Sequence, residues 1–246
     1  MSLLNVERIK LTTTRSPWWC TAVAALISFG FALLFALTYR NGIPSDAPDY
    51  SLSLIESGTA GFGMFVIMIM AALSITTEYR FSIIRTTFQA APRRWQVLCA
   101  KAAFLGSVGL VLGEIFAFGS VLLAKGLNSM PLTFSSAADW RSVAGIGVVY
   151  ALAAIVSVAV GALLRQSAGA IALVLLWPLL VENLVGIIPS VGHGIQKWMP
   201  FLNASNFLGQ NSGANFLSPW ASLLYFAVVV AAIFGLAVFM VERRDA

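Results

Sequence analysis

The sequence predicts an all-α integral membrane protein with six transmembrane helices. Of its 246 residues, 59% are hydrophobic and only 10% are charged, and the mean hydropathy is +0.87. A soluble domain of this length needs far more polar surface. The apolar residues also gather into six runs, each long enough for a helix to cross a hydrocarbon core of about 30 Å, and none alternates like a barrel strand. The predicted spans are residues 18–38, 58–75, 102–124, 143–164, 168–188 and 220–241.

The first span is expected to be retained in the membrane. Its run begins too late and is too long for a signal-peptide h-region of about 7–15 residues. Ser16 is a candidate cap, Pro17 suits a first helical turn, and Trp18 and Trp19 suit the headgroup level.

Basic residues predict that both termini lie in the cytoplasm. With the N-terminus inside and six alternating spans, the inner segments carry many more Lys and Arg residues than the outer ones, as the positive-inside rule requires. The inner residues are Arg8, Lys10, Arg15, Arg80, Arg85, Arg93, Arg94, Lys101, Arg165, Arg243 and Arg244, and the outer ones are Arg40, Lys125, Arg141 and Lys197. The net charge of +5 then reflects topology and anionic membrane lipid rather than binding of nucleic acid.

The chain reads as one transmembrane domain, residues 1–246, without a soluble domain. Short polar segments connect most spans, but the outer segment 189–219 is half apolar, which favours short helices that dip into the outer leaflet. An inverted-repeat transporter is expected to show paired interrupted spans. Here only the fifth span is interrupted, by Pro178, and no internal repeat is found, so the pattern argues against that class.

The sequence offers no catalytic or metal-binding constellation. His193 is the one histidine, and no cluster of His, Cys and carboxylate residues accompanies it. No GxxxxGK[S/T] motif occurs, so this chain does not cradle nucleotide phosphates through a P-loop. Cys20 and Cys99 fall toward the reducing cytoplasmic side and are expected to be free thiols. The chain is therefore not expected to be an enzyme or to hold a cofactor.

Two acids fall at membrane depth, where charge is costly and usually functional or paired. Glu114, in the middle of the third span, is either a polar point on a substrate path or a group that fixes helix packing. Glu182, near the outer end of the fifth span, reads as a packing residue or one that reaches the interface. Close to Glu114, Gly109 and Gly113 form a small-xxx-small pair that permits close helix approach.

The densest charge lies between the second and third spans, in "TTEYRFSIIRTTFQAAPRRWQVLCAK", residues 76–101. Its spacing predicts a short helix over 77–91, capped by Thr76 or Thr77 and stopped by Pro92. An apolar stripe of Phe81, Ile84, Phe88 and Ala91 runs beside a polar edge of Glu78, Ser82, Arg85 and Gln89. Arg93, Arg94 and Lys101 are expected to anchor the next span at the inner headgroups. A helix that merely lies on the lipid surface is the alternative.

This segment resembles the connection between the second and third spans of ABC-2-type permeases, the membrane subunits of bacterial, in particular actinobacterial, ATP-binding-cassette exporters. That family carries an E-Y/F-R stretch, a T-I/L-R-T-like stretch and a P-R/S-R/K turn. The matching residues here are Glu78, Tyr79, Arg80, Ile84, Arg85, Thr86, Thr87, Pro92, Arg93, Arg94 and Lys101. The N-terminal "VERIKLTTTRSPWW" is similar to the family's membrane-surface helix, with Glu7, Lys10, Leu11 and Arg15 matching.

The resemblance implies an ABC-2-type (type V) exporter fold in the bacterial cytoplasmic membrane. Two permease subunits, identical or homologous, would form the path, and two cytoplasmic ATPase subunits would bind and hydrolyse MgATP. The resemblance implies that contact with the ATPase is made by Glu78, Tyr79, Arg80, Phe81, Ile84, Arg85 and Phe88. It also implies that residues 1–17 form the surface helix, with Glu7, Lys10 and Arg15 as its functional residues.

The apolar spans favour a hydrophobic or amphiphilic cargo, such as a drug, a lipid or a peptide antibiotic. Two rival functions remain. One is an ATP-independent secondary transporter or channel that uses Glu114, and the other is a non-transporting membrane sensor or immunity subunit.

Overall fold

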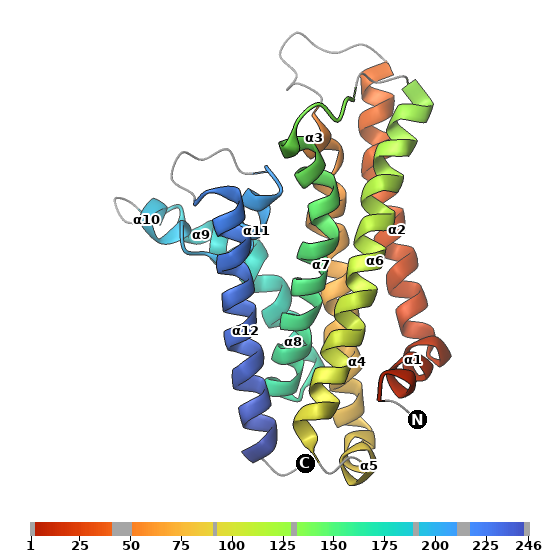
Figure 1. Cartoon of the computed structure of the whole chain (residues 1–246), viewed down its shortest axis with the longest axis vertical. Coiled ribbons are helices and arrows are strands. Elements are labelled where there is room, and N and C mark those ends of the chain that lie inside the picture. The colour runs from red at the N-terminus through yellow and green to blue at the C-terminus, as the bar shows by residue number, and fades with distance from the viewer. Residues whose placement is uncertain are drawn as a thin grey trace.

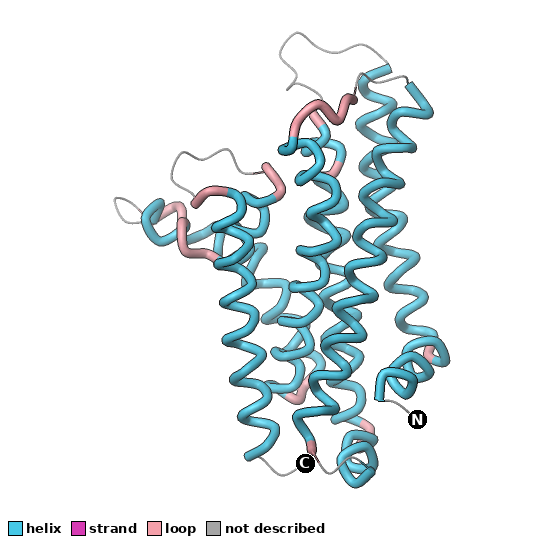
Figure 2. Tube along the Cα trace, viewed as in Figure 1, coloured by secondary structure: helices cyan, strands magenta, loops and turns pink. Residues whose placement is uncertain are grey.

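A computed structural model describes residues 3–40, 51–90, 93–128, 132–188, 192–210 and 217–243. In these ranges the chain is helical and forms no strand (Figures 1 and 2). The elements are α1 (Leu3–Thr13), α2 (Arg15–Arg40), α3 (Leu52–Ile55), the π-helical turn η1 (Thr59–Gly63), α4 (Met64–Arg80), α5 (Ile83–Ala90), α6 (Arg94–Asn128), α7 (Ala137–Leu164), α8 (Ser167–Leu176), the π-helical turn η2 (Trp177–Val181), α9 (Glu182–Val185), α10 (Gly192–Gln196), α11 (Pro200–Phe207) and α12 (Pro219–Arg243).

Six helical segments of the described chain are long and apolar enough to cross a membrane, which confirms the predicted number of spans. They are α2, η1 with α4, α6, α7, α8 through α9, and α12. The third is much longer than predicted: α6 has 35 residues, or about 52 Å at 1.5 Å per residue, and so exceeds the hydrocarbon core. The predicted span 102–124 is only its central part.

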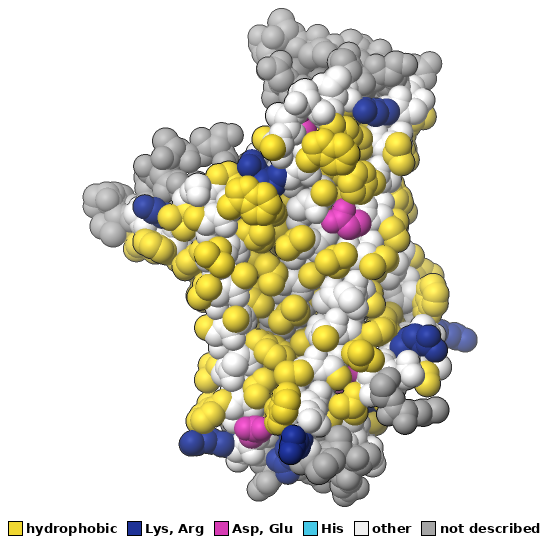
Figure 3. Space-filling model, viewed as in Figure 1, with side chains coloured by type: hydrophobic (Ala, Val, Ile, Leu, Met, Phe, Trp, Pro, Cys, Tyr) yellow, Lys and Arg dark blue, Asp and Glu magenta, His cyan; other side chains and the backbone are white. Residues whose placement is uncertain are grey.

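Helix α7 forms the centre of the bundle. Of its most apolar stretch, 72% is buried, compared with 22% for α2 and for α12. Small residues such as Gly147 and Gly161 let neighbouring helices approach its backbone closely. The outer helices expose leucines and valines, as expected of surfaces that face lipid. Figure 3 shows apolar side chains across the middle of one face, with most Lys and Arg side chains toward the two ends.

The surface helices gather at one end of the bundle. In Figure 1, α1, α5 and the last turn of α12 lie at the lower end, whereas α3 lies near the upper end. This arrangement agrees with an even number of spans. Which end faces the cytoplasm stays a prediction.

The segment after the second span differs from the single helix predicted over 77–91. Helix α4 runs on to Arg80, a turn at Phe81 and Ser82 follows, and α5 begins at Ile83. Ser82 adopts a φ of 58°, in the left-handed region that ends a right-handed helix. The turn prevents one continuous helix because its backbone reverses hand. Ala91 and Pro92 lie outside the described residues.

The predicted caps of that helix are also wrong. The Thr76 and Thr77 hydroxyls lie inside α4 and donate to the carbonyls of Ala72 and Leu73. A side chain engaged within its own helix does not cap the next one.

The fifth span is interrupted at Pro178, as predicted, and the interruption is a π-helical turn. Proline lacks the N–H that an α-helix requires, so the ladder widens locally from α8 through η2 into α9. Within the predicted outer segment 189–219, α10 and α11 are short helices; α10 lies against α9 and α11 against α12 (Figure 1). Residues 189–191 and 211–216 lie outside the described residues.

Candidate functional site

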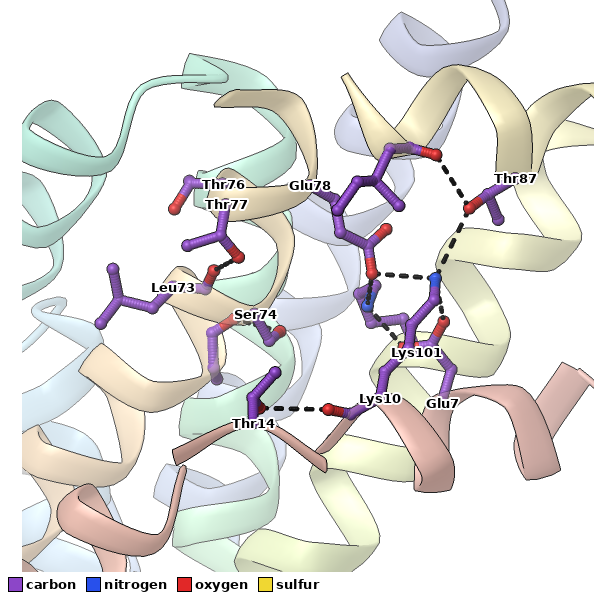
Figure 4. A network of polar contacts seen from close by, with 12 residues as sticks. Glu7, Lys10, Thr14, Leu73, Ser74, Thr76, Thr77, Glu78, Thr87 and Lys101 are labelled. Carbon is purple, nitrogen blue, oxygen red and sulfur yellow. Dashed lines mark hydrogen bonds and ion pairs between the residues drawn. The ribbon is translucent and has the colours of Figure 1, made fainter. Parts of the chain in front are cut away.

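Four charged side chains meet where α1 crosses the ends of α4 and α6 (Figure 4). Lys101 of α6 places its Nζ 2.5 Å from Glu7 Oε2 and 2.9 Å from Glu78 Oε1. Lys10 places its Nζ 2.9 Å from Glu78 Oε1 and 3.3 Å from Glu7 Oε1. Each lysine therefore bridges the same two acids. We call Glu7, Lys10, Glu78 and Lys101 the ion cluster.

Three of the four side chains of the ion cluster are buried. The Lys101 side chain is 2% exposed, and those of Glu7 and Glu78 are 6% and 7% exposed, whereas Lys10 is 29% exposed. Charges buried to this degree persist only when they are paired, because removing one partner strands the other away from water. Two acids and two bases balance each other, so the cluster is neutral as a whole.

The electrostatics of Lys10 reflect this pairing. Partial burial by itself lowers the pKa of Lys10, but the carboxylates of Glu78 and Glu7 outweigh burial and raise the pKa above its usual value. Lys10 is therefore charged at neutral pH, and its attraction for both acids is present throughout the physiological range.

The ion cluster also reaches α5. Lys10 Nζ lies 3.5 Å from Thr87 Oγ1, so one lysine on α1 contacts α4 and α5 together. The sequence assigns Glu7 and Lys10 to the surface helix and Glu78 to the connecting helix, and the structure brings all three together. The predicted role of Lys101 as a headgroup anchor is wrong, because the side chain is buried between helices. In sequence, Lys101 lies just before the predicted span 102–124, whereas α6 begins seven residues earlier, at Arg94.

The predicted apolar stripe of the connecting segment divides in the structure. Ile84 is 3% exposed and lies beside Val97, Leu98 and Val241, so it packs against the protein's own spans. Phe81 precedes α5 and is 65% exposed, so it does not share that face. Ile83 is exposed beside it. The backbones of Arg85 and Phe88 lie in α5, but their side chains, like that of Gln89, are outside the described residues.

The remaining predicted residues occupy the edge of this end. Arg80 is exposed and lies with its guanidinium 5.7 Å from the Phe81 ring centroid. The Tyr79 ring lies beneath Arg165, 5.1 Å from its guanidinium carbon, and so links α4 to the turn between α7 and α8. Arg15 is the first residue of α2 and is exposed, apart from the ion cluster.

A cavity of about 350 Å³ opens beside the ion cluster. Its walls combine apolar side chains, among them Leu73, Phe104 and Leu105, with hydroxyls such as those of Ser74 and Thr77. A largely apolar cavity with a few polar groups in its lining is typical of sites for small amphiphilic molecules.

Glu114 does not join the ion cluster. It lies on α6 where Gly109 and Gly113 approach α7, and its side chain packs against Gly147 so closely that a Cβ at Gly147 would overlap its carboxylate. The predicted close approach of this glycine pair to another helix is confirmed. The close contact between Glu114 and Gly147 favours a packing role for Glu114 over a role in lining a substrate path.

Glu182 supports a neighbouring helix. It is fully buried, so the predicted reach to the membrane interface is wrong. Its two carboxylate oxygens accept the backbone N–H groups of Phe201 and Leu202, at 3.1 Å and 2.8 Å. These are orphan donors in the first turn of α11, so Glu182 acts as its cap from across the fold.

Glu56, which no sequence pattern singled out, is fully buried at the end of the bundle that carries α3. In sequence, Glu56 reads as a loop acid because Ser57 and Gly58 follow it. The available signal was its placement directly after Leu54 and Ile55 and just before an apolar run.

The fold and the ion cluster together define a multi-pass α-helical membrane protein whose surface helices are joined to its spans by buried charges. No protein-family model matches this chain, and no curated protein matches it either. The likeness to ABC-2-type permeases stays a prediction.

Proposed function

We propose that this chain is the permease subunit of an ATP-driven exporter in a bacterial cytoplasmic membrane. The observation that carries the proposal is the ion cluster, which joins the surface helix α1 to the ends of α4 and α6 beside α5. A membrane subunit driven by a separate motor needs such a connection, because a force applied at the surface must reach the spans.

The contacts around α5 suit the transmission of force. Ile84 is inserted between span ends, and the turn at Phe81 and Ser82 is too short to absorb much displacement. Lys10 ties α1 to α5 and α4 together. A push on either surface helix would therefore move the ends of α4 and α6, which are rigid helices, rather than bend a loop.

The motor in this proposal is a pair of cytoplasmic ATPase subunits that bind MgATP, since the sequence of this chain has no P-loop. Phe81 and Ile83 are the exposed apolar side chains at the turn into α5, and they would meet the ATPase. A second permease subunit would complete the path.

The proposed cargo is a hydrophobic or amphiphilic compound. The cavity beside the ion cluster supports this choice, because its apolar walls suit a hydrocarbon body and the charged side chains in its lining suit a polar head.

The test is affinity purification of the tagged chain from its native membrane in mild detergent, followed by mass identification of its partners. We expect a P-loop ATPase to accompany the wild-type chain in comparable amount. Phe81→Ala should weaken that association roughly 30-fold, since loss of a central interface aromatic costs about 2 kcal/mol.

Trp140→Ala provides the matched control, because Trp140 is similarly exposed but lies at the start of α7, at the opposite end. It should retain the ATPase. Purification of the wild type without any P-loop ATPase would contradict the proposal and favour a carrier or channel using Glu114, or a sensor or immunity subunit.

A further inference from the structure

A second buried polar group lies far from the ion cluster, where α3 packs against α2, α6 and α7. Glu56 follows α3, its side chain is 0% exposed, and neither carboxylate oxygen has a hydrogen-bond partner among the described residues. Thr59 approaches the carboxyl, and Tyr150 lies close enough to interact with it electrostatically.

Hydroxyl groups from four elements gather around this place. Tyr150 donates to the Thr59 carbonyl at 2.6 Å, and the Thr59 and Ser120 hydroxyl oxygens lie 3.3 Å apart. The hydroxyl of Ser28 is buried, and it accepts and donates no hydrogen bond within the described ranges. Gly63 makes the arrangement possible, because a Cβ there would lie 2.5 Å from the Tyr150 hydroxyl and 2.8 Å from that of Ser28.

An ionised carboxylate cannot persist here. A buried charge without a partner is far costlier than the neutral acid, so such a group takes up a proton. We propose that Glu56 is a proton-binding site, which holds one proton while this end of the bundle is closed and releases it when the end opens to water. Consistent with this, burial raises the pKa of Glu56 to about 9.

The segment around Glu56 is suited to local opening. It consists of the four-residue helix α3, which is too short to span the membrane, and the π-helical turn η1, which begins the second span ahead of α4. π-Helical turns are rare and occur frequently at functional sites. Movement of this short segment would admit water to the carboxyl without unfolding α4.

Within the part of the chain that the structure describes, the neighbouring charges do not neutralise Glu56. Tyr150 of α7 is the titratable side chain that faces it in the described part of the chain, while α2, α6 and η1 bring the hydroxyls of Ser28, Ser120 and Thr59. At this end of the bundle, the described charged side chains of α6 and α7 contact other groups. Lys125 lies over the Phe134 ring, Asp139 accepts a hydrogen bond from the Ser136 backbone N–H, and Arg141 donates one to the Phe207 carbonyl. The side chains of Tyr39 and Arg40 in α2 lie outside the described residues.

The direction of the pH effect follows from the raised pKa. Below about pH 4.5 the carboxyl is protonated whether the end is open or closed, so pH has no effect there. Between the ordinary value and about 9, only the closed form keeps its proton, so each unit of rising pH favours opening about tenfold. Above about 9 both forms have lost the proton and the effect ends.

Thiol labelling measures this opening. Ser28→Cys places a thiol beside Tyr150, the side chain that faces Glu56, and the change is mild because cysteine and serine differ by one atom. In nanodiscs, with Cys20 and Cys99 replaced by alanine, its labelling rate should rise about tenfold per pH unit between about pH 6 and 8. The rate is taken relative to Ser135→Cys, an exposed site that corrects for ionisation of the thiol.

Adding Glu56→Gln to Ser28→Cys should abolish the relative rise, because an amide resembles the protonated acid but does not titrate. Glu242→Gln, an exposed acid on α12, should leave the rise intact. A flat relative rate with Glu56 present would overturn the proposal, and so would a rise that survives Glu56→Gln.

Difference infrared spectroscopy provides a second measurement that requires no opening. The wild type at neutral pH should show the C=O stretch of a protonated carboxylic acid that Glu56→Gln removes and Glu242→Gln retains. Absence of that difference would also overturn the site. Neither assay contains an ATPase or ATP, so the proton site and the proposed exporter function stand or fall separately.

Discussion

At the scale of single residues, Lys101 determines how the functional end is held together. It is the most buried member of the ion cluster and contacts acids from two different helices. The geometry explains why a lysine is tolerated there, since both of its neighbours carry the opposite charge. Removing it leaves more negative than positive charge in a site that water does not reach.

Lys101→Met should therefore destabilise the protein by about 3–5 kcal/mol, the usual penalty for breaking a buried ion pair from one side. Lys10→Met, which removes the more exposed lysine, should have a smaller effect because Lys101 still pairs with both acids. The measurement is the thermal unfolding midpoint in detergent, monitored by fluorescence-detected size exclusion after heating.

The combination Glu78→Gln with Lys101→Met tests the cause, because it restores charge balance with one acid and one base remaining. It should recover part of the lost stability. If the double variant is no more stable than Lys101→Met, charge imbalance is not the reason for the loss.

At the scale of elements, the contact between α6 and α7 decides how the centre of the bundle packs. Gly109 and Gly113 bring α6 against the backbone of α7 near Gly147 and Tyr150. In a membrane, where lipid is as apolar as the side chains, close backbone approach of this kind is what holds helices together. Glu114 sits at the edge of the contact and depends on the same spacing.

Gly113→Ala should push these helices apart, since the new Cβ would lie 2.8 Å from the Gly147 Cα. Overpacking of this kind costs about 1–3 kcal/mol, visible as a lower unfolding midpoint. Gly126→Ala, on the same helix with nothing within 4 Å, should be neutral or raise stability by up to about 1 kcal/mol. Equal behaviour of the two variants would argue against close packing at Gly113.

At the scale of the whole molecule, the two ends carry different chemistry. One end has the surface helices α1 and α5 and the ion cluster, and the other has α3 and the buried Glu56 (Figure 1). The eleven-to-four distribution of basic residues predicts that the first end lies in the cytoplasm.

Cysteine labelling in intact cells checks this orientation. Ser135→Cys, just before α7, should react with an impermeant thiol reagent added outside, whereas Thr86→Cys on α5 should react only after the membrane is opened. Both positions are exposed in the fold, so any difference in labelling reflects the side of the membrane on which each position lies. Labelling of Thr86→Cys from outside would reverse the topology.

The sequence by itself determined the class of the protein and the number of its spans. This was possible because long apolar runs must become helices in a membrane, whatever their neighbours are. It also indicated the interruption at Pro178 and the close-packing pair Gly109 and Gly113, which depend on backbone chemistry that each residue carries with it.

Tertiary structure alone decided which charges meet. Glu7, Glu78 and Lys101 are far apart in sequence, and only the crossing of α1 over α4 and α6 brings them within bonding distance. The turn at Ser82 likewise separated Phe81 from Ile84, because helical periodicity assumes a continuous helix. Burial of Glu56 and the capping of α11 by Glu182 depend on packing across the fold, and a local pattern does not contain that information.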